Sequence, residues 1–166
     1  FRYMKKNWDF DIDSIIYFCN EELKVDLPEG FKHMPTGKGS FVENLRFILD
    51  NVRQDQVFYM LEDFWPTSPM TSAMFGRLHK IFEEEELDAL QVSSYLPYYS
   101  LEATETPNFF RFSKSSEWIF NFQARFWKTE SFAEFLTEPE VSESSVGSAI
   151  TVEMASDKTA RSSGGL

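Results

Sequence analysis

Two adjacent carboxylates, Glu62 and Asp63, are the residues of this sequence best suited to chemistry. They follow an apolar run at residues 57–61, where a buried strand is expected to end. Pro66 and Pro69 favour a turn just beyond, which would bring both side chains to one edge. Carboxylates in that position suit Mg²⁺ or Mn²⁺, which commonly bind one or two of them together with substrate phosphates. The alternative is structural: Glu62 caps or pairs with a neighbour, and Asp63 begins a loop.

Three further side chains are candidates for ligand contacts. Asn44 lies one turn into a predicted helix, beside its apolar stripe, where a buried amide either meets a ligand or bonds to a backbone carbonyl. Gln123 and Trp127 follow a predicted strand at residues 118–122. The Trp127 ring offers a surface for stacking a sugar or a base, although in so aromatic a chain a Trp is more often a core residue.

Other reaction types find no support in the sequence. His33 and His79 stand apart from any second zinc ligand. Cys19 lies inside an apolar run with no base beside it in the sequence, so it does not read as a nucleophile. Neither the phosphate-binding G-x-x-x-x-G-K-[ST] pattern nor the G-x-S-x-G nucleophile pattern occurs.

Composition places the chain in the globular class. The 166 residues carry a net charge of −11, and aromatic residues make up 17%. So much aromatic surface excludes wholesale disorder, and the acidic balance argues against nucleic-acid binding. No apolar run is long enough to be a transmembrane segment. A single cysteine predicts a reducing compartment, hence a cytoplasmic protein.

Apolar runs of strand length alternate with amphipathic segments along the chain. Ser40 and Glu43 form the S-x-x-E capping box that begins the clearest helix. Alternation of this kind predicts an α/β fold, a mostly parallel sheet flanked by helices, with a β-rich C-terminal segment and terminal helices. The predicted helices span residues 40–53, 68–86, 130–137 and 142–156, and the predicted strands span residues 14–19, 31–34, 57–61, 87–92, 98–101, 109–112 and 118–122.

Two segments resemble a known family. The pattern S-F-V-E-N-L-R-F-I-L-D-N-V-(x)₄-V-F-Y-M-L-E-D-F, and the later W-I-F-N-F-Q-A-R-F-W-K, are similar to segments of bacterial glycosyltransferase-like proteins of the GT-A fold. The resemblance covers roughly residues 8–136. It implies one GT-A-like domain over residues 1–157 that lacks its first strand, with a flexible tail at residues 158–166. A fragment of this kind would expose a sheet edge and associate through it.

The resemblance also implies roles for particular residues. Glu62 and Asp63 would hold Mn²⁺ or Mg²⁺ and the nucleotide diphosphate, with Asp63 as the metal ligand and Glu62 as a second ligand or ribose contact. Asn44 would face the donor pocket, and Gln123 and Trp127 would lie at the boundary between donor and acceptor. The general base would be a carboxylate beyond the acceptor segment, for which the candidates are Glu140, Glu143 and Glu153.

The implied reaction moves a sugar from a nucleotide-diphospho-sugar to an acceptor hydroxyl. A divalent cation would stabilise the leaving diphosphate, and a carboxylate would take the proton of the hydroxyl. Two other hypotheses stay open. The chain is a catalytically silent binding or structural module of the same fold, or it is a metal-dependent phosphoesterase that uses the same carboxylates.

Overall fold

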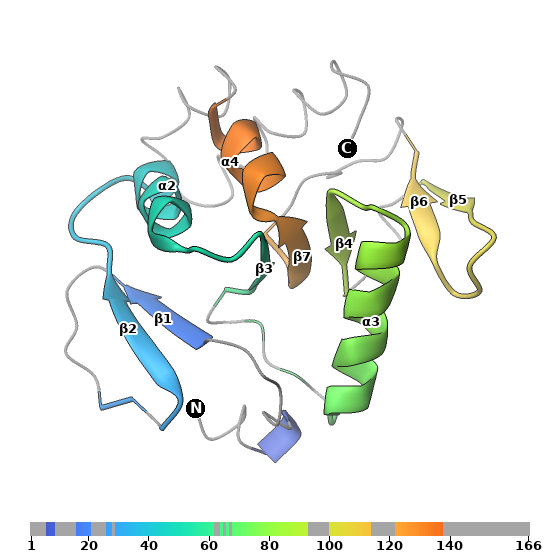
Figure 1. The fold of residues 1–166 in the computed structure, drawn as a ribbon, viewed down its shortest axis with the longest axis horizontal. Helices are drawn as coiled ribbons and strands as arrows, with labels where there is room; N and C mark the ends of the chain where they lie inside the picture. The colour runs from blue at the N-terminus through green and yellow to red at the C-terminus, as the bar shows by residue number, and fades with distance from the viewer. Residues whose placement is uncertain are drawn as a thin grey trace.

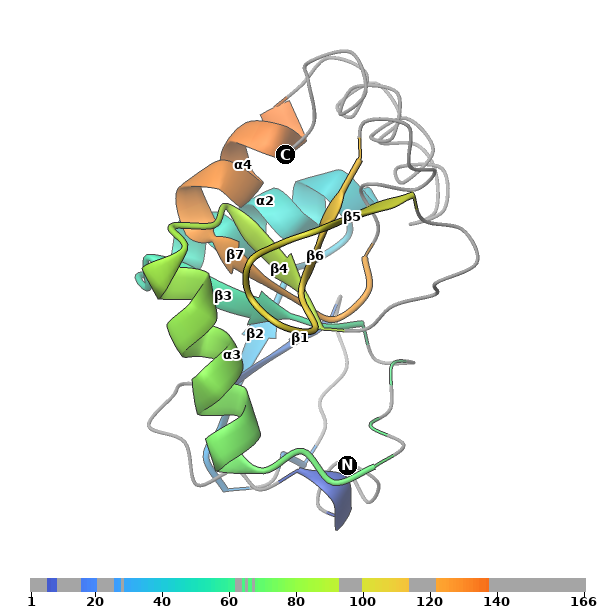
Figure 2. The same cartoon turned by 90° about the vertical axis from the view of Figure 1, so that its right-hand side faces the viewer.

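A three-stranded sheet with helices packed against both of its faces forms the centre of the molecule (Figures 1 and 2). The structure is a computed structural model that describes residues 6–8, 16–20, 26–27, 29–61, 64, 66, 68–92, 100–113 and 122–137. Its elements are β1 (Ile16–Asn20), β2 (Phe31–Pro35), α2 (Phe41–Asn51), β3 (Gln56–Tyr59), α3 (Ser72–Glu84), β4 (Ala89–Gln91), β5 (Leu101–Ala103), β6 (Phe110–Phe112), β7 (Arg125–Lys128) and α4 (Thr129–Thr137).

The central sheet has the strand order β3-β7-β4, and β7 runs antiparallel to both of its neighbours. The registers place Tyr59 and Gln91 opposite the same residue, Arg125. Strands β5 and β6 form a separate antiparallel pair at one side of the molecule (Figure 1). Only β1 and β2, among the described strands, pair in parallel.

The prediction of a mostly parallel sheet is therefore wrong. Long apolar runs indicate that a strand is buried on both faces, but they carry no information about its direction. Here β3 and β4 run the same way, as alternation with helices suggests, yet β7 lies antiparallel between them and makes all their described pairings. Residues 123–127 were predicted to follow a strand, so β7, the strand that sets the topology, was not predicted.

One face of the sheet carries a cluster of aromatic rings beneath α3. Phe58 of β3 and Phe126 of β7 have ring centroids 4.8 Å apart. Phe75 of α3 packs 5.1 Å from the first ring and 4.9 Å from the second. Phe82, two turns further along α3 than Phe75, stacks on Phe126 with ring centroids 5.8 Å apart. Edge-to-face and tilted rings at these separations are favourable and fix α3 to the sheet.

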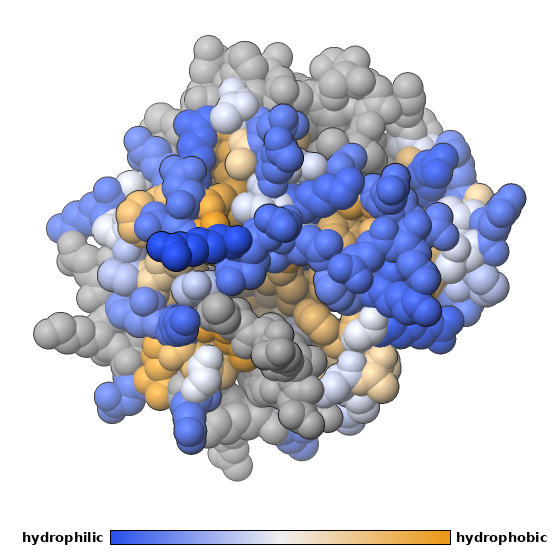
Figure 3. Space-filling model, viewed as in Figure 1, coloured by the Kyte–Doolittle hydropathy of each residue, from blue (hydrophilic) through white to orange (hydrophobic). Residues whose placement is uncertain are grey.

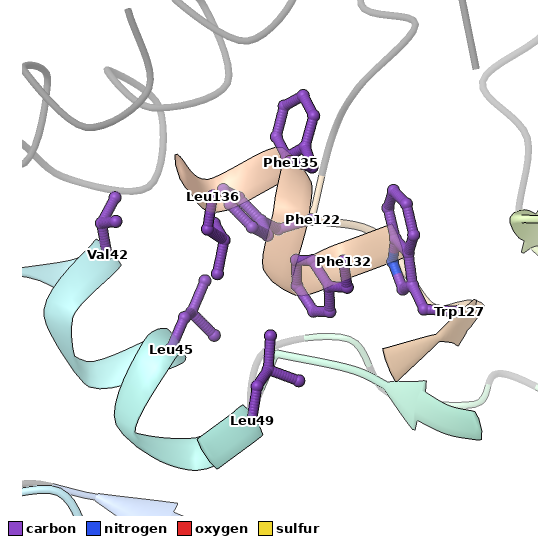
Figure 4. Close-up of a cluster of buried hydrophobic side chains, with 8 residues drawn as sticks. All are labelled: Val42, Leu45, Leu49, Phe122, Trp127, Phe132, Phe135 and Leu136. Atoms are coloured by element: carbon purple, nitrogen blue, oxygen red, sulfur yellow. The ribbon is translucent and has the colours of Figure 1, made fainter. Parts of the chain in front are cut away.

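The opposite face is the main hydrophobic core, and α2 and α4 cover it (Figure 4). Strand alternation explains the division, because side chains two apart point to the same face. Val57 and Trp127 on this face sit directly opposite each other in register, one residue away from Phe58 and Phe126 on the other. The buried members of this core are Val42, Leu45, Leu49, Phe122, Trp127, Phe132, Phe135 and Leu136.

Local sequence signals explain where the helices begin. The prediction of a capped helix at residues 40–53 is confirmed: the Ser40 hydroxyl accepts the Glu43 N–H, and the Glu43 carboxylate accepts the Ser40 N–H at 2.8 Å. Helix α3 begins later than predicted from Pro69. Its N-cap is Thr71, whose hydroxyl accepts the N–H of Met74 at 3.2 Å.

Two predicted elements fall wholly or largely outside the described residues. These are the helix at residues 142–156 and most of the strand at residues 118–122. The short strands expected at residues 98–101 and 109–112 correspond to β5 and β6, with β5 displaced toward the C-terminus. On the face shown in Figure 3, most of the described surface is hydrophilic, in keeping with the high charge of the chain. Three large apolar side chains of the described residues are exposed: Phe47, Met74 and Phe110.

Candidate functional site

The carboxyl ends of β3 and β4 and the start of β7 meet at one edge of the central sheet. Because β7 is antiparallel to both neighbours, the last residues of β3 and β4 lie beside its first residue. Tyr59, Arg125 and Gln91 consequently form a row across the three strands, on the face covered by α2 and α4. This row, with Gln123 just before β7, is the polar row discussed below.

Arg125 is the centre of the polar row. Its side chain is buried, with 4% of its surface exposed. Its guanidinium donates a hydrogen bond to Gln91 Oε1 at 2.5 Å and lies over the Trp127 ring at 5.3 Å from the centroid. A planar guanidinium can stack on a ring and still donate in its own plane, which a lysine ammonium cannot do. Burial of this cation thus depends on contacts from β4 and β7 together.

Gln123 is held by the same network. The Gln91 amide donates to Gln123 Oε1 at 3.1 Å, while its oxygen accepts from Arg125. Both polar ends of Gln91 are therefore engaged. Gln123 was a candidate from its sequence position, whereas Gln91 and Arg125 were not. The spacing of Arg125 and Trp127, two residues apart, was a usable signal, because it places both on one face once residues 125–128 are read as a strand.

Trp127, a predicted stacking platform, lies in the core. It is 1% exposed, and its ring stacks on Phe132 of α4 with centroids 4.8 Å apart and planes 13° apart. Figure 4 shows the two rings among the side chains contributed by α2 and α4. The Trp127 ring therefore contacts both the Phe132 ring of α4 and the Arg125 guanidinium. The structure thus gives Trp127 the core position that was the alternative to ligand stacking.

Asn44, the other predicted donor contact, bonds to backbone. Its amide donates to the Gly39 carbonyl at 3.4 Å, just before the N-terminus of α2. The approach is close: a Cβ placed on Gly39 would lie 2.8 Å from Asn44 Oδ1. Asn44 is on α2, and no described contact links its side chain to the polar row. The structure therefore does not bring Asn44 together with Gln123.

The acidic pair itself lies outside the described residues, but the chain on either side of it is described. Leu61 packs against the main core, so the backbone continues from β3 along the covered face. The N–H of Phe64 donates to the Leu61 carbonyl at 3.2 Å. A hydrogen bond from residue i+3 to residue i is the mark of a β-turn. Glu62 and Asp63 stand between these two residues in the sequence, and the turn expected at the acidic pair stays a prediction.

Glu140, Glu143 and Glu153 lie outside the described residues. Among the residues that the structure describes, no three His, Cys, Asp or Glu side chains gather closely enough to hold a metal ion. Burial raises the pKa of the Cys19 thiol to about 11, so the thiol is protonated at neutral pH.

Comparisons with known proteins do not assign a family. No protein-family model, no curated protein and no solved structure matches the chain. Of the helices in the described ranges, none has both the length and the apolar character required to cross a membrane.

Proposed function

We propose that this chain transfers a sugar from a nucleotide-diphospho-sugar to an acceptor hydroxyl, at the edge of the central sheet where β3 ends. One observation carries the proposal: directly after β3 the Phe64 N–H donates to the Leu61 carbonyl at 3.2 Å, and the two residues between them in the sequence are Glu62 and Asp63. Acidic residues that directly follow a strand of the central sheet are candidates to meet a ligand there.

The two segments that resemble glycosyltransferase-like proteins also support the proposal. The segment that ends in Glu62 and Asp63 contains β3, and the later segment contains β7. These strands are hydrogen-bonded neighbours, with Val57 opposite Trp127 and Tyr59 opposite Arg125. Stretches more than sixty residues apart in the sequence thus meet at the edge where the acidic pair follows.

The donor set fits a hard divalent cation. The carboxylates of Glu62 and Asp63 are the oxygen ligands that Mg²⁺ and Mn²⁺ prefer, and both cations keep open positions for phosphate oxygens. When bound there, the cation would supply charge stabilisation for the leaving diphosphate. The chain's own part is to hold the pair at the turn and to provide a carboxylate base for the acceptor hydroxyl, for which Glu140, Glu143 and Glu153 remain the candidates.

Calorimetric titration tests the proposal. The protein is titrated with UDP-, GDP- and dTDP-sugars, each with and without Mn²⁺. We expect one donor class to bind with a Mn²⁺-dependent heat that Asp63→Asn abolishes and Glu62→Gln reduces. Asp50→Asn is the matched control, because Asp50 is an exposed carboxylate on α2. Binding that survives Asp63→Asn unchanged would remove the pair from the site.

A second function, a catalytically silent module, is favoured by one specific observation. Three of the four predicted donor contacts are engaged with other parts of the protein: Trp127 in the core, Asn44 with the Gly39 carbonyl and Gln123 with the Gln91 amide. The same titrations separate the two functions. Flat heats with all donors, with and without Mn²⁺, would support the silent module. For either function the single cysteine fits a reducing compartment, and we place the protein in the cytoplasm.

A further inference from the structure

The segment of residues 6–8, called the anchor segment below, makes polar contacts with the chain just before α3. The Asn7 side-chain amide donates to the Pro66 carbonyl at 2.7 Å, and the Asn7 backbone carbonyl accepts the N–H of Met70 at 2.6 Å. Trp8 and Met70 also form an isolated parallel β-bridge. Asn7 thus binds with both its side chain and its backbone, although it lies 59 positions from Pro66 in the sequence.

Trp8 supplies the apolar part of the contact. Its side chain is buried, and its ring centroid lies 5.7 Å from that of Phe58 on β3 and 5.7 Å from that of Phe75 on α3. Figures 1 and 2 both place the described N-terminal residues beside the first turn of α3. Aromatic rings at such separations attract one another in addition to the apolar surface that they bury. The Trp8 ring is therefore held by a strand and a helix that both come later in the chain.

These contacts are of the kind by which proteins bind extended peptides. In β-strand addition, backbone hydrogen bonds hold the peptide, and the surroundings of one or two side chains select its sequence. Here Met70 binds the peptide backbone, Pro66 accepts from an amide side chain, and Phe58 and Phe75 contact an aromatic ring. These four residues, the docking site, therefore fit an extended segment in which an asparagine directly precedes a tryptophan.

The same contacts are equally possible between two copies of the chain. They reach β3, α3 and the residues before α3, whereas the chain continues from the anchor segment to β1. Every copy carries the matching segment, and Asn followed by Trp occurs in the sequence only at residues 7 and 8. Exchange of an identical element between two copies gives a closed, symmetric dimer. We propose that the docking site of one copy binds the anchor segment of a second copy when its own segment is displaced.

The structure also sets an upper limit on the dissociation constant. A segment on a short link has an effective concentration on the order of millimolar, and residues 9–15 form such a link between Trp8 and β1. Because the anchor segment occupies its own docking site, its intrinsic dissociation constant lies below that concentration. A free peptide of the same sequence should accordingly bind an emptied docking site with a dissociation constant below about 1 mM.

The first test titrates a synthetic peptide of residues 4–10 into the full chain and follows the Met70 amide signal by NMR. We expect saturable binding to Trp8→Ala, whose own segment lacks the ring, and little binding to wild type. Asn7→Ala keeps the ring but loses one hydrogen bond, so it should bind the peptide about fivefold more tightly than wild type. Asn51→Ala is the matched control, because the Asn51 amide donates to the Phe47 carbonyl at 2.8 Å on α2, and it should behave as wild type.

A control peptide with alanine in place of tryptophan has the same charge and should not bind. Equal binding of the two peptides would overturn the docking site, since the attraction would then be electrostatic. Absence of peptide binding by a folded Trp8→Ala protein would overturn it as well. If Trp8→Ala does not fold, Asn7→Ala decides: peptide binding no tighter than that of wild type would refute the proposal.

The second test asks whether another copy is the occupant. Trp8→Ala keeps the docking site, and Phe75→Leu keeps the anchor segment but removes one ring from the site. Light scattering after size-exclusion chromatography should show a dimer in an equimolar mixture of the two variants and monomers of each alone. A mixture that stays monomeric at concentrations where the peptide binds would overturn the second copy as the partner. Equal association of each variant alone would also overturn it, because it would reflect general exposure of aromatic surface.

Discussion

Replacing Trp127 by alanine decides between the two roles that this residue was given. The side chain is 1% exposed and is stacked on Phe132 on the α4 side and on the Arg125 guanidinium. Truncating a buried Trp to Ala typically costs about 3–5 kcal/mol, from lost apolar burial and the cavity left behind. A whole domain is stable by only about 5–15 kcal/mol. The change should therefore remove a large part of the unfolding free energy.

Urea denaturation followed by circular dichroism measures this cost. With a slope of about 2 kcal/mol/M, a loss near 4 kcal/mol lowers the midpoint by about 2 M. Trp127→Phe keeps a ring against Phe132 and should lose much less. Phe110→Ala is the control at an exposed aromatic, 57% exposed on β6, and should change stability by no more than about 0.5 kcal/mol. A Trp127→Ala protein of nearly wild-type stability that has lost donor binding would refute the core assignment.

The other predictions concern the α2 cap and the lone thiol. Ser40→Ala should lower the unfolding free energy by about 1 kcal/mol, measured by urea titration, because the Glu43 N–H loses its acceptor. The hydrogen bond from the Ser40 backbone N–H lowers the Glu43 pKa from 4.5, so its stabilising effect is present above that pH and is lost as the pH falls through the folded pKa. The difference in urea midpoint between wild type and Glu43→Gln should shrink below pH 4.5, and a difference that is constant with pH would contradict this. Cys19, with its pKa raised to about 11, should react with an aromatic disulfide reagent far more slowly at pH 8 in the native protein than in urea, and equal rates would contradict its burial.

Local signals in the sequence were sufficient for the elements with their own start and stop residues. The helix beginning at Ser40 was predicted because its capping box and apolar stripe are both encoded within fourteen residues. The helix at residues 130–137 and the strand run at residues 57–61 were likewise found near α4 and β3. In each case the information lies within the element, where propensity and periodicity act.

Strand direction and the identity of β7 were beyond that kind of reasoning. Arg125 and Lys128 interrupt the apolar pattern of β7. The more apolar run before it, residues 118–122, was therefore predicted as the strand instead. A charged residue belongs in this strand only because Gln91, from another strand, accepts its hydrogen bond. That partner is 34 residues away, so no local window contains it. The same holds for Asn7, whose contact with Pro66 depends on tertiary packing.

For the site, the sequence drew attention to Gln123 and left two roles open for Trp127, of which the structure shows the core position. A turn was expected because prolines follow the acidic pair closely; for Glu62 and Asp63 it stays a prediction, beside the hydrogen bond from the Phe64 N–H to the Leu61 carbonyl. Trp127 was proposed as a ligand contact because the residue type alone does not tell a core ring from a ring that stacks on a ligand. Only the packing of Phe132 against it distinguishes the two.

Paramagnetic broadening by Mn²⁺ in the NMR spectrum locates the cation most directly. If the turn after β3 holds it, substoichiometric Mn²⁺ should broaden the backbone amide signals of Leu61 and Phe64 first, and Asp63→Asn should abolish the effect. The acidic end of α3, residues 83–86, is the natural competitor, because four consecutive glutamates attract cations without a built site. Broadening centred on those glutamates, with Leu61 and Phe64 unaffected, would contradict a metal site at the edge of the sheet.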